Sequence, residues 1–335
     1  MTMLGEAKRS GRWLELDWPS LVAGSVAETE ESSGTGAPAE RPETVPLRAG
    51  SHPHEVRQWL LARSLFPAKW INRLFSIGGI GWNGDKLRLL AFPPLDPKAD
   101  PIYRMALQPS RSAAPDVLHE DDFCLVLHKP AGMPVHESSP GQRGTLGEAA
   151  ARHMLEKGDP LTIRHVHRLD DDTSGPVLYA KNDLAQWRLD EAMRLKRIDR
   201  HYVAVVQGRL AKAAGKIDLP IGKDRHHRAR RRVSAGGEPA VSHYEAIADG
   251  RQFTIVRVKL ETGRTHQIRV HMSHIGHPLL GDALYGGDSR VLPHQALHGE
   301  KLLFPHPWTN ASMEARAPWP DWLEKLARSA IRRSK

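Results

Sequence analysis

The nine residues HRLDDDTSG, at positions 167–175, combine three successive carboxylates with two turn-forming hydroxyl residues and a final glycine. The carboxylates at 170–172 repel one another, and the nearby Arg164 and Arg168 offer compensating charge. Taken alone, such a segment is typical of a solvated acidic turn in which Gly175 supplies a backbone conformation that other residues avoid. Its meaning therefore depends on the rest of the chain.

A second polar segment, ETGRTHQIRVH at positions 261–271, supplies cations and hydrogen-bond donors suited to pairing with an acid. An aspartate held against an arginine stays ionised at neutral pH and is oriented for nucleophilic or acid–base chemistry. The two segments together favour a catalytic carboxylate over a solvated turn.

The sequence around these segments predicts the fold class. Apolar runs bounded by Gly, Pro and charged residues predict strands, and periodic apolar residues predict helices. The expected strands are 123–128, 177–180, 202–207, 241–247, 253–260 and 267–271, and the expected helices are 145–155 and 183–196. Because strands do not alternate strictly with helices, the pattern favours an α+β domain with a mixed, largely antiparallel sheet over a doubly wound one. The sequence contains no GxxxxGK[ST] P-loop motif for binding phosphate.

The composition of the 335 residues, 40% hydrophobic and 26% charged, is typical of a globular protein. Apolar runs are too short to span a bilayer, and the first 18 residues lack the apolar centre of a secretory signal. We therefore expect a cytoplasmic protein with no membrane partner. The single cysteine, Cys124, excludes an intrachain disulfide and a cysteine-rich zinc site.

Charge is distributed unevenly along the chain. Residues 1–50 hold 5 basic and 8 acidic residues, a net charge of −3, whereas the whole chain carries +9. The remaining 285 residues therefore carry +12. A basic body with an acidic leader is typical of proteins that bind a polyanion, above all nucleic acid.

Histidine is abundant enough for a metal site to be tested. The segment HVHRLD at 165–170 is similar to the HxHxDH signature of binuclear metallohydrolases, but Asp170 comes one position too late and Asp171 follows it instead of His. A metal-dependent hydrolase that uses His165, His167 and Asp170 is therefore only an alternative interpretation.

A second group of histidines comprises His266, His271, His274 and His277. In the strand expected at 267–271, His266 and His271 would point to opposite faces, which prevents chelation. We therefore expect no metal ligands in this chain.

On these segments the chain resembles the RluA-type pseudouridine synthases. HRLDDDTSG has every fixed position of the family signature HRLDxxTSG, RHYVAVVQG around Tyr202 is similar to the second family motif, and TGRTHQIRVHMSHIGHPLLGDALYG resembles the third. EDDFCLVLHKPAGMPVHE, GTLGEAA and ALHGEKLLFPHP fit as well. The resemblance spans residues 103–310. It implies the pseudouridine synthase fold and a cofactor-free isomerase that converts uridine in RNA to pseudouridine.

The resemblance assigns roles to individual residues. Asp170 corresponds to the catalytic aspartate, which attacks either carbon 6 of uracil or carbon 1′ of the sugar. Tyr202 corresponds to the tyrosine that stacks on the flipped uracil and is able to accept the proton from carbon 5, and Arg264 to the arginine that pairs with the aspartate. Arg168 corresponds to the residue that fills the gap left by the flipped base. The signature residues expected to contact RNA are His167, Arg168 and Thr173.

The N-terminal part of the chain is expected to lie outside the catalytic domain. Residues 1–50 read as an acidic, mostly disordered leader, because 23–50 have almost no large apolar side chains. The alternating apolar residues between Trp13 and Trp18 are able to add a short strand elsewhere, but a tail is the expectation.

Residues 51–91 predict a small basic module. Two helical apolar patterns precede an Asn83-Gly84 hairpin signal, and the segment resembles the helix-pair RNA-binding module that precedes many such synthases. Residues 92–102 form a Pro-rich linker, and 103–335 form the catalytic domain.

The most basic run, GKDRHHRARRR at 222–232, holds six basic residues and one acidic residue. Such runs are usually solvated loops. This one lies between the strands predicted at 202–207 and 241–247, from which a loop can reach the rim of the catalytic cleft. The residues of the run expected to bind RNA phosphates are Arg228, Arg230, Arg231 and Arg232.

A protein of the same fold that binds RNA without turnover is the main rival interpretation. The joint presence of Asp170, Tyr202 and Arg264 argues against it. We expect a monomer without cofactor whose partner is RNA, with ribosomal RNA favoured over transfer RNA because of the appended basic module.

Overall fold

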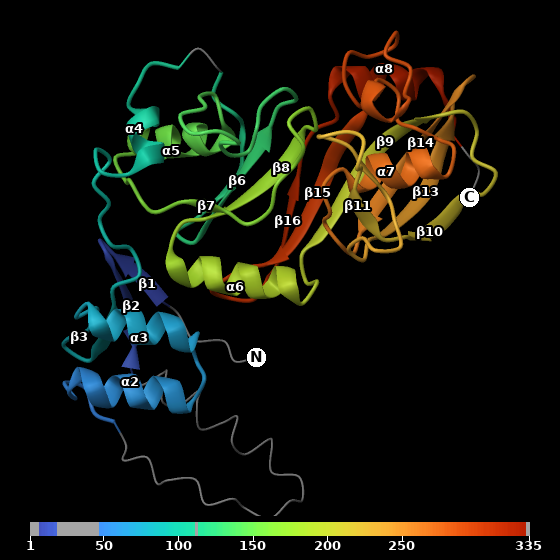
Figure 1. Ribbon diagram of the computed structural model, residues 1–335. Coiled ribbons are helices and arrows are strands. Elements are labelled where there is room, and N and C mark those ends of the chain that lie inside the picture. The colour runs from blue at the N-terminus through green and yellow to red at the C-terminus, as the bar shows by residue number, and fades with distance from the viewer. Residues whose placement is uncertain (1–6, 19–46, 111–112, 333–335) are drawn as a thin grey trace, which may run out of the picture.

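The computed structural model describes residues 7–18, 47–110 and 113–332, which form a small N-terminal module and a larger body (Figure 1). Within the named sheets, all strand pairs are antiparallel. The expected α+β class with largely antiparallel pairing is confirmed. The body holds two main sheets rather than one.

The larger sheet occupies the C-terminal half of the body, in the order β10-β13-β14-β9-β15-β16, and β17 pairs with β13. The strand β9 at its centre is buried from residue 202 to residue 206, whereas the neighbouring β14 exposes Arg257 and Lys259. The strands are β9 (Asp199–Gln207), β10 (Ala214–Asp218), β13 (Val241–Asp249), β14 (Phe253–Leu260), β15 (Leu297–Pro305), β16 (Ser312–Arg316) and β17 (Ile331–Arg332). The helices of this half are α7 (Gln267–His274), the short 3₁₀ helix η1 (Ala283–Tyr285) and α8 (Asp321–Ser329).

The smaller sheet has the order β5-β6-β8-β7 and carries helices at both sides, as Figure 1 shows. Its elements are β5 (Val117–Glu120), β6 (Cys124–Lys129), β7 (Arg164–His165), β8 (Gly175–Ala180), α4 (Pro101–Ala106), α5 (Leu146–Glu156) and α6 (Asp183–Arg194). Each helix begins at a polar cap: Asp100, Thr145 and Asn182 accept hydrogen bonds from the first-turn amides. The helices predicted at 145–155 and 183–196 are therefore present nearly to the residue.

The N-terminal module contains the helix pair and the hairpin that the sequence predicts. It comprises α2 (Pro53–Ala62), α3 (Ala68–Ser76), β3 (Ile80–Asn83) and β4 (Lys86–Leu89), joined by β1 (Ala7–Ser10) and β2 (Trp13–Asp17) in the order β1-β2-β4-β3. The leader expectation is thus wrong for 7–18. Leu14, Leu16 and Trp18 are buried in the module core, so the apolar alternation there does build a strand. Residues 19–46 lie outside the described residues.

The module is fixed to the body by several buried or partly buried contacts. Arg9 binds Asp159 through two hydrogen bonds of 2.7 Å. Arg188 of α6 donates to the Leu65 carbonyl at 3.1 Å, and the ring of Phe66 stacks on Trp308. The module is therefore held in one position against the smaller sheet.

One predicted strand, 267–271, is wrong: these residues form α7. Apolar residues alternate through Ile268, Val270 and Met272, as in a strand with one buried face. Residues 267–272 of the helix are all buried. Because apolar and polar positions are buried alike, the alternation of apolar residues does not indicate the two-residue period of a strand. The argument that His266 and His271 point to opposite faces of a strand falls with that assignment.

Candidate active site

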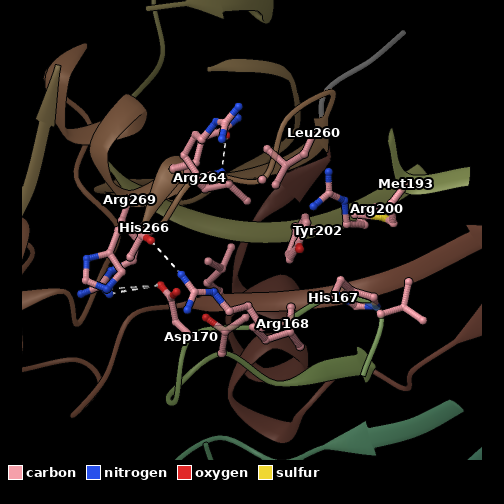
Figure 2. A pocket seen from close by; sticks show the side chains of 18 residues that line it. His167, Arg168, Asp170, Met193, Arg200, Tyr202, Leu260, Arg264, His266 and Arg269 are labelled. Carbon is pink, nitrogen blue, oxygen red and sulfur yellow. Dashed lines mark hydrogen bonds and ion pairs between the residues drawn. The ribbon is translucent and has the colours of Figure 1, made fainter. Parts of the chain in front are cut away.

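A pocket of about 260 Å³ lies where the two sheets of the body meet. The loop between β7 and β8, strand β9, the end of β14 and the residues before α7 all contribute to its lining. Figure 2 shows Asp170, Arg269 and His266 toward one end, with Tyr202 and Arg200 toward the other. The structure therefore brings the two polar segments of the sequence together.

The Thr-Ser-Gly end of the signature joins the two sheets. The Ser174 carbonyl accepts a hydrogen bond from Gly299 of β15 at 2.7 Å, and the Ser174 hydroxyl lies 2.8 Å from Nδ1 of His298. Gly175 has a φ of 136°, and a Cβ atom there would lie 2.6 Å from Cα of Gly299. Only glycine permits this approach, so the signature fixes the loop that carries Asp170 against the larger sheet.

Asp170 presents its carboxylate at the edge of the pocket. Its Oδ2 accepts a hydrogen bond from Nη1 of Arg269 at 3.2 Å, and its side chain is 24% exposed. The Asp170 carbonyl accepts from the Thr173 amide at 3.0 Å, which closes a tight turn. The carboxylate is thus oriented by a cation and still open to a ligand.

Arg269 is held in turn by Asp282. Its Nε and Nη2 donate to the two carboxylate oxygens of Asp282 at 2.7 and 2.8 Å, and its guanidinium lies 5.0 Å from the centre of the Tyr285 ring. Burial opposes the charge on Arg269, but Asp282 and then Asp170 raise the pKa of its guanidinium above the ordinary value. The cation beside Asp170 is therefore permanent.

The expected pairing of Arg264 with Asp170 is corrected by the structure. Arg264 lines the pocket, but its Nη1 binds Glu238 and its Nε donates to the Pro239 carbonyl at 3.1 Å. Arg264 precedes α7 and turns toward the neighbouring loop, whereas Arg269 lies inside the helix, on the side that faces Asp282. Arg264 and Arg269 both belong to the segment at 261–271. Asp282, in the GDALYG stretch of the third motif, binds Arg269 and is the residue that distinguishes the two arginines.

His266 completes this end of the pocket. It has a left-handed backbone, with φ 59°, and its Nε2 lies 3.9 Å from Oδ2 of Asp170. Its Nδ1 is 2.9 Å from the Tyr285 hydroxyl. Burial lowers the pKa of the imidazole despite the nearby Asp170, which favours the neutral ring at neutral pH.

Gln267 holds the loop that carries these residues, and sequence reasoning missed it. Its side-chain oxygen accepts from the Arg264 amide at 3.0 Å and the Thr262 hydroxyl at 2.8 Å. Its Nε2 donates to the Val241 carbonyl at 2.9 Å. The amide therefore ties the start of α7 to strand β13.

Tyr202 lies on β9 and is almost fully buried, where burial raises the pKa of its hydroxyl. Arg168 lies at the pocket rim and is exposed, and its Nη2 donates to Thr265 Oγ1 at 2.9 Å. The pocket thus combines a carboxylate and an aromatic ring with the long, exposed side chain of Arg168 at its mouth.

Comparisons with known proteins decide the family. The profile described as RNA pseudouridylate synthase matches residues 123–274. The Bacillus subtilis (strain 168) protein named uncharacterized RNA pseudouridine synthase YhcT is 46% identical over 216 residues, which cover 64% of this chain and 72% of that protein. The chain belongs to the RNA pseudouridylate synthase family.

Other relatives agree with this assignment. The ribosomal large subunit pseudouridine synthase D of Vibrio vulnificus (strain CMCP6) is 42% identical over 231 residues, covering 65% of this chain and 71% of that protein. The solved structure of human RNA pseudouridylate synthase domain containing 1 covers 67% of this chain and 92% of its own, with a TM-score of 0.56 and 23% identity, and so shows the same fold. The RluA-type resemblance is confirmed, and this synthase is an isomerase that converts uridine to pseudouridine in RNA.

Two signature residues of the synthase are directed at protein groups. Nε2 of the buried His167 accepts a hydrogen bond from the Leu178 amide at 3.2 Å, and burial lowers the pKa of His167 to about 3. Thr173 is 1% exposed, and its Oγ1 accepts from Nε2 of Gln295 at 3.3 Å. Both line the pocket, and their contact with RNA stays a prediction.

Lys129 holds the loop that carries Asp170, and the sequence did not predict this role. Its fully buried ammonium donates to the carbonyls of Pro130, Met133 and Asp171 at 2.6–2.9 Å. Burial lowers its pKa to about 8, although the carboxylates at 170–172 favour the charge. One buried cation thereby fixes the residue that follows Asp170.

The basic run at 222–232 forms a hairpin beside the site. Strands β11 (Ile221–Lys223) and β12 (Arg231–Val233) pair, and the Arg231 amide donates to the Tyr285 hydroxyl at 2.9 Å, the same hydroxyl that contacts His266. The exposed members of the predicted set are Arg228, Arg230 and Arg232. Arg230 lies 3.4 Å from Asp224, and Arg231 is half-buried.

The three residues of the alternative metal-dependent hydrolase, His165, His167 and Asp170, do not form a group of metal ligands. His165 stacks on His136, and Nε2 of His167 is occupied by the Leu178 amide. Among the described residues, one group of three or more potential ligands is close enough for a metal, and it consists of His119, Asp121 and Cys124. The Asp121 carboxylate there already accepts from His119, His306 and the amides of residues 123 and 124, which accounts for its position.

The described part of the chain contains no helix that is long and apolar enough to cross a membrane.

Proposed function

We propose that this synthase modifies uridines of large-subunit ribosomal RNA, with Asp170 as the nucleophile. The observation that carries the role of Asp170 is its contact with Arg269, whose charge Asp282 fixes. The permanent cation orients the Asp170 carboxylate, and the partial exposure of that carboxylate leaves it accessible to a base in the pocket. The substrate class is supported by the Vibrio vulnificus relative named ribosomal large subunit pseudouridine synthase D.

The reaction needs a closed pocket more than a cofactor. The bond between uracil N1 and sugar C1′ breaks and a bond between C5 and C1′ forms, while a proton leaves C5 and N1 gains one. Asp170 attacks either carbon 6 or carbon 1′ and is released at the end, so no oxidant or reductant is consumed. Tyr202 lines the pocket and is buried, and we propose that its ring stacks on the base and its hydroxyl accepts the C5 proton.

RNA reaches this pocket as a flipped nucleotide. Arg168, exposed at the rim, is suited to stacking in the gap that the flipped base leaves. The basic hairpin at 221–233 borders the site, and its exposed arginines are suited to phosphate contacts. The N-terminal module has the exposed basic residues Lys69 and Arg73 on α3, which are suited to further phosphate contacts. A monomeric state, a cytoplasmic location and the domain boundaries remain predictions.

The proposal is tested by mapping pseudouridines. Ribosomal and transfer RNA from cells that lack the gene are incubated with the purified synthase, and pseudouridine positions are read before and after. We expect new pseudouridine in large-subunit ribosomal RNA with the wild type and none with Asp170→Asn. Tight RNA binding without any new pseudouridine would instead support the rival of a binding protein that has lost turnover. Elemental analysis showing bound metal would revive the hydrolase alternative.

A further inference from the structure

A second cavity, of about 410 Å³, lies at the outer edge of the smaller sheet. It is bounded by the loop that leads to α5, by β7 and β8, and by the first turn of α6. The side chains that matter below are His136, Arg164, His165, Tyr179 and Gln186. None of them serves in the reaction described above. We call this space the Tyr179 cavity.

Two side chains that line the Tyr179 cavity each have a buried polar atom without a partner among the described residues. The Tyr179 hydroxyl is buried, with 2% of the residue exposed, and makes no hydrogen bond there. The Gln186 side-chain oxygen is buried and unpartnered as well, although its Nε2 donates to Asp190 at 2.7 Å. Leaving such groups unpaired costs stability, which a ligand carrying both a donor and an acceptor removes.

The cavity also presents a stacking face. The rings of His136 and His165 are stacked, with centroids 5.0 Å apart and planes 12° apart, and the Tyr179 ring meets His165 edge-on. His136 is exposed and His165 half-buried. Burial lowers the pKa of His165, so its ring is a neutral flat surface. A planar heterocycle is the ligand shape that extends such a stack.

The Tyr179 cavity and the active-site pocket share one stretch of chain. Residues 163–165 line the cavity and residues 166–170 line the pocket. His165 and Asp170 are five positions apart in the sequence, a span of at most about 18 Å. Along this stretch Arg164 and Arg168 are both exposed, so a strand whose target base enters the pocket passes cations on its way to the cavity.

We propose that the Tyr179 cavity binds a second unpaired nucleobase of the substrate RNA, close in sequence to the target uridine. A nucleobase offers a flat face for the histidine stack and an edge with adjacent donor and acceptor atoms for Gln186 and Tyr179. The cavity is larger than the pocket for the target base, so a purine fits as well as a pyrimidine. This inference rests on the proposed RNA substrate and adds a second point of sequence recognition to it.

The test is a coupling experiment between protein and RNA. Each nucleotide flanking the target uridine is replaced in turn by an abasic residue, and dissociation constants are measured for the wild type and for the variant Tyr179→Phe/His165→Ala. We expect one abasic position to weaken binding to the wild type by about tenfold, and expect that loss to disappear in the variant. Equal losses in both proteins at every position would overturn the proposal.

Tyr103→Phe is the matched control, because Tyr103 is another buried tyrosine of the same half whose hydroxyl donates to the Leu161 carbonyl at 2.6 Å. It should leave the tenfold effect intact. Tyr179→Phe alone should not lower the melting temperature, since it removes an unpartnered group, whereas Tyr103→Phe should lower it. Pseudouridine formation by the wild type on the unaltered RNA checks the proposed function separately: turnover without coupling refutes only the second base site.

Discussion

Oδ2 of Asp170 lies 3.2 Å from Nη1 of Arg269, and the other edge of the same guanidinium is occupied by Asp282. Asp282 is 1% exposed and Arg269 8%, so the orientation of the cation is fixed by a buried pair rather than by solvent-exposed groups. Asp170 therefore meets a charge that is already in place before RNA binds, which is the arrangement that preorganised catalysis requires.

The first prediction separates the two arginines of the segment. Arg269→Lys removes the two-pronged contact with Asp282 and should lower the single-turnover rate by about a hundredfold, because a lysine cannot bridge two carboxylates in this geometry. Arg264→Lys, which changes the contacts with Glu238 and the Pro239 carbonyl but none with Asp170, should lower it less than about fivefold. The rates are measured at saturating RNA. A larger defect in the Arg264 variant would restore the pairing that the sequence suggested.

The second prediction concerns the junction of the sheets. Gly175→Ala places a Cβ atom 2.6 Å from the backbone of Gly299 and should destabilise the protein by about 3 kcal/mol or more. Gly132→Ala is the control: Gly132 also has positive φ, 80°, but nothing lies within 4 Å of its Cβ position, so the cost should be about 1 kcal/mol. Urea unfolding of the two variants compares them, and equal losses would show that the close approach is unimportant.

The third prediction is a pH dependence that originates at Lys129. Its pKa is lowered to about 8 by burial, so raising the pH above 8 removes one of the three donors that hold the Pro130, Met133 and Asp171 carbonyls. We expect the single-turnover rate to fall between about pH 8 and 9. Folding stability should not fall with it through this group, because a lysine whose pKa is lower when folded gains relative stability as the pH rises between the folded and unfolded values.

Two measurements check this dependence. Single-turnover rates and melting temperatures are recorded together over the pH range, and any activity that Lys129→Arg retains should be flat, since a guanidinium stays charged. A wild-type rate that stays level or rises above pH 8 would exclude a role for this ammonium.

The fourth prediction concerns the basic hairpin. Replacing Arg228, Arg230, Arg231 and Arg232 with alanine should weaken RNA binding by about 1–3 kcal/mol and lower the slope of log affinity against log salt by roughly two to three. The rate at saturating RNA should change little, because these side chains lie beside the pocket and do not line it. An unaltered salt slope would assign the hairpin to bulk solvent and leave binding to the N-terminal module.

The sequence predicted the strands β6, β8, β9, β13 and β14 and the helices α5 and α6, because their apolar periods and caps are local, but it did not predict β15 or β16. It mistook α7 for a strand, since a helix buried on several sides loses its period. It placed Asp170, Tyr202 and Arg168 at the pocket from motifs, but chose Arg264 over Arg269. That choice depends on where Asp282 lies in space, and no pattern within one segment reports it.

The N-terminal strands show the same limit. Leu14 and Leu16 alternate as a strand does, yet an isolated pair of short strands is not stable, so a tail was the natural expectation. The pairing of Leu16 with Leu87 of β4, more than sixty residues away, supplies the missing partner. Lys129 was unrecognised for a related reason, because one of its carbonyl partners, Asp171, lies 42 residues away in the sequence.

The central claim is that Asp170 acts as the nucleophile in a preformed pocket, and Asp170→Asn tests it most directly. The amide has the same shape but is not nucleophilic, so single-turnover pseudouridine formation should be undetectable. The melting temperature and the dissociation constant for the RNA should stay close to those of the wild type, with the affinity changed by less than about threefold. The reason is that the substitution alters only one partly buried hydrogen bond, the one that Arg269 donates to residue 170. A rate within tenfold of the wild type would contradict the assignment of Asp170.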